Sequence, residues 1–284
     1  MRVDSLLAQG LTRSFEFFPP KSDDESVVLD QTLRDLGPLR ASFVSVTNRG
    51  GVPSRQRTFD LVTDVQRERH TSAMAHLICV GYTRDAMRGL LARYAEAGVE
   101  NVMALGGDPS DDPTLGASEF NYALELVELA REAGDFSIGV AAHPLGHPRS
   151  SDLRSDRRHL ATKLTVADFA ITQFFFEAQD YFSLVEQLGA LGVTKPVIPG
   201  IMPVTTLSGI ARMALMGAAV PAGLRTRLEE AQRRGGPQQV RAEGVRAATE
   251  LCAELLTAGV PGLHFYTLNR STATREIHRT LFGG

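Results

Sequence analysis

Short and almost uninterrupted apolar runs alternate with amphipathic stretches along the whole chain. Eight of these runs have the length and the β-branched and aromatic content of strands. They are 14–18, 43–47, 73–80, 101–105, 137–142, 169–176, 196–203 and 263–268. Most are apolar at consecutive positions and not only at every second position, which is typical of parallel strands covered on both faces.

Segments with helical periodicity follow the runs. Clear examples are 24–36, 84–97, 119–133 and 178–191. Thr83 is placed to cap the start of the second example, and Gly98 to end it. The stretch 204–262 is longer, and its Pro-Gly breaks at 221–223 and 235–237 predict three helices there.

Eight alternating units in 284 residues predict an α/β fold, a (β/α)8 TIM barrel that forms a single domain over residues 1–284. An open doubly wound sheet is the alternative. It is less favoured because no GxGxxG motif follows the first strand. In a barrel, the functional residues are expected at the C-terminal ends of the strands.

Composition narrows the classes of function. The formal net charge of -3 leaves no electrostatic footprint for nucleic acid. The start of the chain lacks the apolar segment of a signal peptide and no run reaches membrane-spanning length, so a soluble, cytoplasmic protein without a membrane partner is expected. Cys79 and Cys252 fit no metal-ligand spacing. No metal is therefore predicted, and both cysteines are expected to be buried apolar residues.

The first run carries an unusual charge. Glu16 stands between Phe15 and Phe17, and strand alternation turns it away from both phenylalanines. Burial of a carboxyl is costly and raises its pKa toward neutrality, which suits a general acid. A structural glutamate paired with an Arg or Lys of the barrel is the alternative, and this segment alone favours neither.

Other polar residues gather where further strands are expected to end. They are Thr47, Asn48, His76, Gly106, Gly107, Asp108, His143, His147, Gln173 and the segment 266–270. Each residue by itself has a purely structural explanation. His76 fits a core histidine, Asp108 a loop cap, and Gln173 a contact with neighbouring backbone. Their convergence at one end of a barrel is hard to explain by packing and indicates a site.

Six segments resemble one known family. They read SFEFFPP (14–20), FVSVT (43–47), ALGGD (104–108), ITQFFF (171–176), IPGIMP (198–203) and HFYTLNR (264–270). In this order, and over nearly the whole chain, they resemble the catalytic barrel of methylenetetrahydrofolate reductase. The resemblance implies a (β/α)8 barrel, in agreement with the count of runs.

The resemblance also implies an activity. The family reduces 5,10-methylenetetrahydrofolate to 5-methyltetrahydrofolate with NADH or NADPH, which supplies methyl groups for methionine synthesis. N10 must be protonated before the bridging carbon can accept hydride, and the resemblance assigns this acid step to Glu16. It places Asp108 as a second catalytic residue beside the developing cation. It assigns Gln173 to the pterin edge, and Tyr266 and Arg270 to the folate site.

The cofactor is where the chain departs from the family. Members usually carry FAD and read Arg-Gly-Asp after the fourth strand, where this chain has Gly106, Gly107 and Asp108. His143 replaces a frequent tyrosine, and Tyr82 stands where a small residue is common. The positions expected to contact NAD(P)H or a flavin are Thr47, His76, Gly107, His143, His147, Asp156 and Lys163. Because the folate-matching residues are retained, we expect FAD to be absent and NAD(P)H to transfer hydride directly. An FAD-dependent ping-pong enzyme is the alternative.

Two other classes remain as alternatives. A non-catalytic folate-binding barrel has little need of an acid such as Glu16. A different barrel oxidoreductase, of the proline dehydrogenase kind, does not explain Glu16, Asp108 and Gln173 together. The expected partners are small molecules only. The sequence leaves the choice between NADH and NADPH open, because it has no Rossmann fingerprint, and it leaves the oligomeric state open as well.

Overall fold

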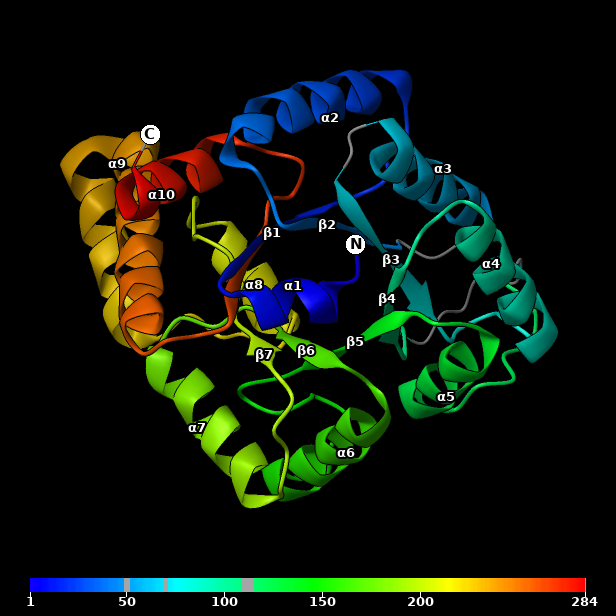
Figure 1. The fold of residues 1–284 in the computed structure, drawn as a ribbon. Coiled ribbons are helices and arrows are strands. Elements are labelled where there is room, and N and C mark those ends of the chain that lie inside the picture. The colour runs from blue at the N-terminus through cyan, green and yellow to red at the C-terminus, as the bar shows by residue number, and fades with distance from the viewer. Residues whose placement is uncertain (49–51, 69–70, 109–114, 284) are drawn as a thin grey trace.

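The computed structural model describes residues 1–48, 52–68, 71–108 and 115–283, and these form nine parallel strands in one nearly closed barrel (Figure 1). The order around the barrel is β7-β6-β5-β4-β3-β2-β1-β9-β8. The strands are β1 (Thr12–Phe17), β2 (Phe43–Val46), β3 (Ser72–Ile78), β4 (Asn101–Leu105), β5 (Ser137–Ala142), β6 (Phe169–Thr172), β7 (Val197–Ile198), β8 (Gly200–Ile201) and β9 (Gly262–Tyr266). The predicted TIM barrel is confirmed.

The seventh strand of the barrel is split in two. β7 pairs with β6 and β8 pairs with β9, and Pro199 lies between them. Proline has no N–H to give to a ladder, although its carbonyl accepts from His264 N at 3.0 Å. The single predicted run 196–203 therefore appears as two short strands within an eight-stranded plan.

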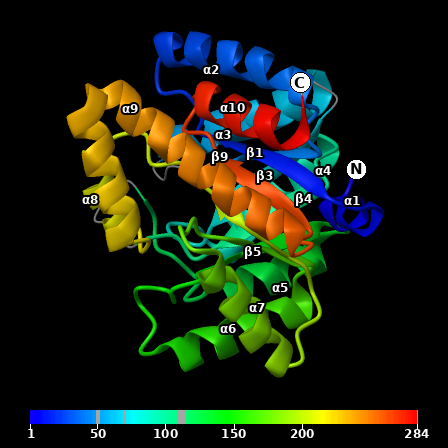
Figure 2. The same cartoon turned by 90° about the vertical axis from the view of Figure 1, so that its left-hand side faces the viewer.

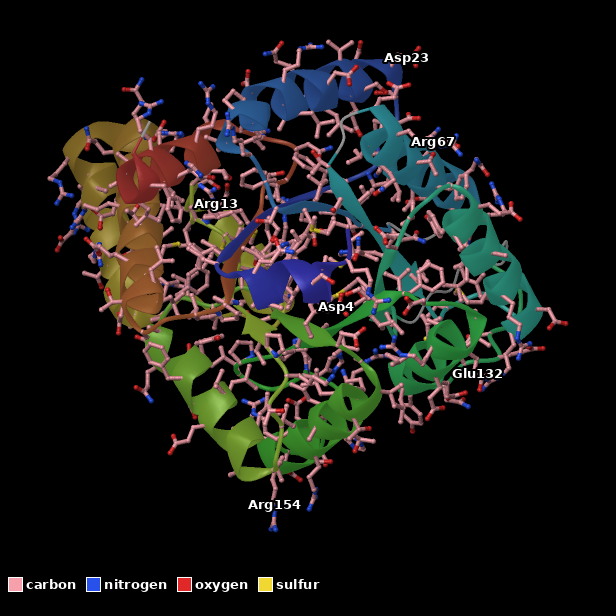
Figure 3. All side chains as sticks on the ribbon, in the orientation of Figure 1. Asp4, Arg13, Asp23, Arg67, Glu132 and Arg154 are labelled. Atoms are coloured by element: carbon pink, nitrogen blue, oxygen red, sulfur yellow. The ribbon has the colours of Figure 1, made fainter. Side chains whose placement is uncertain are left out.

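Helices surround the barrel (Figure 1). They are α1 (Val3–Gln9), α2 (Asp23–Leu36), α3 (Val52–Glu68), α4 (Arg84–Glu96), α5 (Ala123–Ala133), α6 (Leu153–Val166), α7 (Ala178–Ala190), α8 (Gly209–Leu215), α9 (Ala222–Thr257) and α10 (Thr272–Phe282), with a 3-10 turn at Gly37–Leu39. Thr83 caps α4 as predicted, accepting from Ala86 N at 3.2 Å. Long polar side chains on the outer surface, such as Asp23, Glu132 and Arg154, point away from the barrel (Figure 3).

The long stretch after β8 forms three helical pieces, as predicted. α8 is the first, and α9 is interrupted at Gly235 and Gly236, whose backbone is not helical. Gly236 has a φ of 67°, in the left-handed region that glycine tolerates best. Figure 2 shows the two arms of α9 at an angle to each other.

Strand alternation sorts the side chains into two layers. Phe15 and Phe17 point outward into the large apolar core beneath the helices, and each is 1% exposed. A smaller inner cluster fills the barrel with Val3, Phe43, Met74, Met103, Phe169, Ile171 and Ile198. Cys79 and Cys252 are buried as predicted. None of the helices in the described ranges combines the length and the apolar composition that a bilayer span requires.

The two ends of the barrel are closed differently. α1, which the sequence did not predict, lies across the N-terminal end, and Val3 N donates to Asn101 Oδ1 at 2.7 Å. α8 lies at the opposite end, toward which the parallel strands run (Figures 1 and 2). The C-terminal ends of the strands, with the predicted site residues, therefore face the α8 side.

Candidate active site

Glu16 lies near the end of β1 with its carboxyl inside the barrel, and the residue is 9% exposed. Every hydrogen bond or ion pair that described side chains make with this carboxyl falls on Oε2. Ser45 Oγ lies 3.4 Å from it, and His76 Nε2 and His264 Nε2 each lie 3.5 Å from it. These partners are a serine and two histidines, not the Arg or Lys that a structural ion pair requires.

Burial and the two histidines act on the pKa of Glu16 in opposite directions. Burial is the largest influence on this carboxyl and raises its pKa, but His76 and His264 lower it, and the net pKa lies below its ordinary value. The rise expected from burial alone is therefore wrong in net direction. Burial also lowers the pKa of His76, and a neutral imidazole attracts a carboxylate only weakly. The pKa of Glu16 thus depends on the contacts that His76 and His264 make with Oε2.

Tyr266 ends β9 and Gln173 follows β6, so both lie at the same end of the barrel. The Tyr266 hydroxyl donates to the carbonyl of Thr172 at 2.6 Å, and burial raises the pKa of this phenol. Gln173 follows β6 directly. Its Nε2 donates to Met216 O at 3.2 Å, and its Oε1 accepts from Phe174 N at 3.0 Å. The amide is therefore held by backbone groups, one of them in the segment just after α8.

Thr47, Asp108 and Arg270 also follow strands at this end. Thr47 is half-buried, whereas Asp108 and Arg270 are exposed. Among the described residues, no hydrogen bond or ion pair joins any of the three side chains to Glu16. The barrel brings them to the same end without direct contact.

The β5–α6 segment carries a separate polar cluster. The rings of His143 and His147 meet edge to face with centroids 4.6 Å apart. Burial, followed by the neighbouring His147, lowers the pKa of His143 to about 4. Asp156 accepts from His147 N at 3.1 Å and pairs with Arg157 NH1 at 2.7 Å. These predicted cofactor residues contact one another and not Glu16.

Two basic residues border that cluster. Lys163 Nζ donates to Ala141 O at 3.2 Å, and burial lowers the pKa of Lys163. Arg149 NH2 donates to Gly107 O at 3.0 Å and would lie 3.7 Å from a Cβ placed on Gly106. Arg149, a residue that sequence reasoning missed, therefore places a guanidinium beside positions 106 and 107.

The bulky side chain of Tyr82 takes no space from the candidate site. Its side chain is buried in the layer between barrel and helices, with the Arg55 guanidinium 3.7 Å from the ring centroid. Arg55 also donates to Gly81 O at 2.8 Å. The bulk at position 82, read from the sequence as a change in a flavin-contacting segment, is accommodated in the core.

Sequence reasoning also missed Ser14 and His264. Ser14 Oγ lies 2.8 Å from His264 Nδ1, and both residues are buried. A signal for them existed, because residues two apart share a strand face. Ser14 precedes Glu16 by two positions, and His264 precedes Tyr266 by two. In the described ranges, no three His, Cys, Asp or Glu side chains group as metal ligands would.

Comparisons with known proteins identify the family to which the chain is similar. The family model for methylenetetrahydrofolate reductase matches residues 2–282. The 5,10-methylenetetrahydrofolate reductase of Pectobacterium carotovorum subsp. carotovorum is 33% identical over 270 residues, which are 94% of this chain and 89% of that protein. Methylenetetrahydrofolate reductase (NADH) 1 of Arabidopsis thaliana is 32% identical over 285 residues, 94% of this chain and 48% of that protein.

One solved structure matches the fold over its full extent. It is an uncharacterized protein from Clostridium thermocellum described as binding two copies of 5-methyl-5,6,7,8-tetrahydrofolic acid. The TM-score is 0.71 at 12% identity, covering 98% of this chain and 97% of that chain. At this identity the likeness supports the barrel fold alone.

Proposed function

This chain belongs to the methylenetetrahydrofolate reductase family, and from that membership we propose that it reduces 5,10-methylenetetrahydrofolate to 5-methyltetrahydrofolate with NAD(P)H as hydride donor. One observation carries the proposal: a buried carboxyl at the C-terminal end of β1, Glu16, whose described contacts all fall on one oxygen. The product would supply methyl groups for methionine synthesis.

The first chemical step that we propose is proton transfer from Glu16 to N10 of the folate. The bond between the bridging carbon and N10 then breaks, its electron pair stays on N10, and N5 is left as a methylene iminium cation. Glu16 becomes a carboxylate. The neighbouring histidines favour that charged form, which makes Glu16 a stronger acid than burial alone would allow.

The second step is hydride transfer. The hydride leaves C4 of NAD(P)H and bonds to the iminium carbon, which gives the 5-methyl product and NAD(P)+. Asp108 is assigned to stabilise the cation between the two steps. Gln173 is assigned to the pterin edge, since an amide both donates and accepts. To offer its N–H to folate, Gln173 exchanges its contact with Met216 O.

We propose that this hydride transfer is direct. FAD, when bound in a relative, would supply a relay for the hydride. Three of the residues expected to hold it are engaged by groups of this chain: Asp156 is paired with Arg157, Lys163 donates to a backbone carbonyl, and the His143 ring packs on His147. These contacts support the flavin-free route. The guanidinium of Arg149, beside Gly107, is assigned to bind the phosphates of NAD(P)H.

The test uses the purified protein. We expect it to show no stoichiometric flavin absorption and to oxidise NADH only when methylenetetrahydrofolate is present. NADH is tried first because the name of the Arabidopsis relative specifies it. Direct transfer requires both substrates to be bound together, so initial-rate plots intersect, whereas a flavin relay gives parallel lines. Tight folate binding without NAD(P)H oxidation would instead indicate a non-catalytic folate-binding barrel.

A further inference from the structure

A buried histidine lies next to Glu16, and a buried serine lies next to that histidine. Ser14 of β1 and His264 of β9 are register partners and are 0% and 1% exposed. Ser14 Oγ lies 2.8 Å from His264 Nδ1, and His264 Nε2 lies 3.5 Å from Glu16 Oε2. The Phe43 ring is stacked on the imidazole with an interplanar angle of 15°. The imidazole is therefore held between a hydroxyl, a carboxyl and an aromatic face.

This arrangement favours one form of the imidazole, because the Ser14 hydroxyl lies 2.8 Å from Nδ1 and 3.5 Å from its other possible acceptor, Leu263 O. A neutral histidine carries its proton on one nitrogen, and the hydrogen bond made by the other nitrogen decides which one. A Ser14 hydroxyl that donates to Nδ1 leaves the proton on Nε2, which faces Glu16. An ionised carboxylate can only accept hydrogen bonds, so Nε2–H is the form that serves it.

The same form also serves the protonated acid. All described contacts of the carboxyl fall on Oε2, and a carboxyl protonated on Oε1 still accepts at Oε2. His264 can therefore donate to Glu16 before and after proton transfer without changing tautomer. The distance of 3.5 Å is long, as hydrogen bonds of catalytic groups often are before substrate binds.

We propose that Ser14 and His264 are positioning residues for Glu16: Ser14 keeps the His264 proton on Nε2, and His264 holds Oε2 so that Oε1 carries the proton for N10. The inference rests on the proposed role of Glu16 as the acid. The proposed roles are orientation and acidity, and they require no contact of Ser14 or His264 with the folate.

Three other side chains of the described residues lie around the Glu16 carboxyl and its partner His264. His76 of β3 lies 3.5 Å from Oε2, but its Nε2 makes no hydrogen bond with described residues. Ser45 of β2 donates from 3.4 Å. Tyr266 of β9 meets the His264 ring edge to face at 5.2 Å and directs its hydroxyl to Thr172 O. In the part of the chain that the structure describes, the second nitrogen of His264 has a partner, Ser14 Oγ, which lies 2.8 Å from Nδ1.

The sign of the effect follows from the contact. Donation from His264 favours the charged carboxyl, so its loss raises the pKa of Glu16. We expect His264→Leu and Ser14→Ala to move the alkaline limb of the kcat profile to higher pH by about one unit, since a hydrogen bond to a charged group has about that effect. At the optimum, kcat falls on the order of 10-fold in His264→Leu, and KM for folate stays within about twofold of wild type.

The variants are chosen to separate orientation from packing. His264→Gln keeps an N–H near the Nε2 position. The alkaline limb of its kcat profile should therefore lie close to the wild-type pH. Ser137→Ala is the matched control for Ser14→Ala, because Ser137 is also a barrel serine with 0% exposure but accepts from Asp4 N, far from Glu16. It should leave the limb unchanged.

The deciding readout does not need turnover. The Glu16 carboxyl is followed by 13C NMR titration of glutamate-labelled protein, with Glu16→Gln used to assign its signal. A raised Glu16 pKa in Ser14→Ala and His264→Leu supports the inference, even if the wild type fails to reduce folate and the proposed function fails. An unchanged Glu16 pKa in folded Ser14→Ala and His264→Leu overturns it, as would an equal shift in Ser137→Ala or no recovery in His264→Gln.

Discussion

Replacing Glu16 by glutamine removes the acid while keeping the shape of the side chain. Glutamine has nearly the same volume, and its amide oxygen can still accept at the position of Oε2. Its N–H cannot be transferred to N10 at neutral pH. A positioned general acid typically contributes about 100- to 10,000-fold in rate, so kcat should fall by that factor, or by about 3–5 kcal/mol of barrier.

The fold should tolerate this change. The Oε2 contacts of Glu16 are long, at 3.4 and 3.5 Å, and the substitution removes a buried charge. We expect the free energy of unfolding to change by less than about 1 kcal/mol, because a neutral amide is cheaper to bury than a carboxylate. Folate binding, measured by calorimetry, should stay within about threefold of wild type because the acid acts in the transition state.

Glu243→Gln is the matched control. Glu243 is a buried glutamate of α9, 6% exposed, that accepts from Arg227 and Arg246 at 2.6 Å. Its neutralisation should lower the free energy of unfolding by about 1–2 kcal/mol and leave kcat unchanged. The assay is anaerobic NADH oxidation with methylenetetrahydrofolate, beside denaturant unfolding. Turnover of Glu16→Gln within about threefold of wild type would refute the acid role.

Three further predictions follow from the other site residues. Asp108→Asn should lower kcat roughly 100-fold through loss of charge beside the iminium, which steady-state assays measure, and unchanged kinetics would remove Asp108 from the mechanism. Gln173→Ala should raise KM for folate about 10-fold but leave KM for NADH unchanged, and equal effects on both would contradict its assignment to the pterin. The lowered pKa of His143, about 4, means that the unfolded chain binds this proton first, so stability should fall as pH drops from about 6.5 to 4. Thermal unfolding of His143→Phe should show a shallower fall, and an equal slope would refute this.

Much of the fold is visible in the sequence because strand and helix periods are local. β4 and β5 begin and end at the residues that the apolar runs indicate. β6 is shorter than its run, which continues to 176, because Gln173 accepts from Phe174 N, and Phe174 and Phe176 enter another core cluster. α5 begins later than predicted, at Ala123, because Glu125 accepts from Tyr122 N at 3.1 Å and caps the helix there.

The sequence predicts which residues lie at the strand ends of the site. It does not predict which side chains there contact one another. Glu16, His76 and Tyr266 lie at the same barrel end, as the strand count implied. The contact of Ser14 with His264 joins residues 250 positions apart, so it exists only once β1 pairs with β9. Arg149 follows β5 and reaches Gly107, which follows β4 and is 42 positions away, so no local pattern shows this contact.

Following the hydride from NADH into the methyl group of the product tests the proposed chemistry most directly. The enzyme is supplied with NADH deuterated at both C4 positions and with unlabelled methylenetetrahydrofolate in ordinary water, and the product methyl group is measured by mass spectrometry. Direct transfer predicts one deuterium in every 5-methyl group. A flavin relay exchanges the label with water at the reduced flavin nitrogen, so methyl groups without deuterium would contradict direct transfer. Absence of any methyl product would contradict the proposed activity itself.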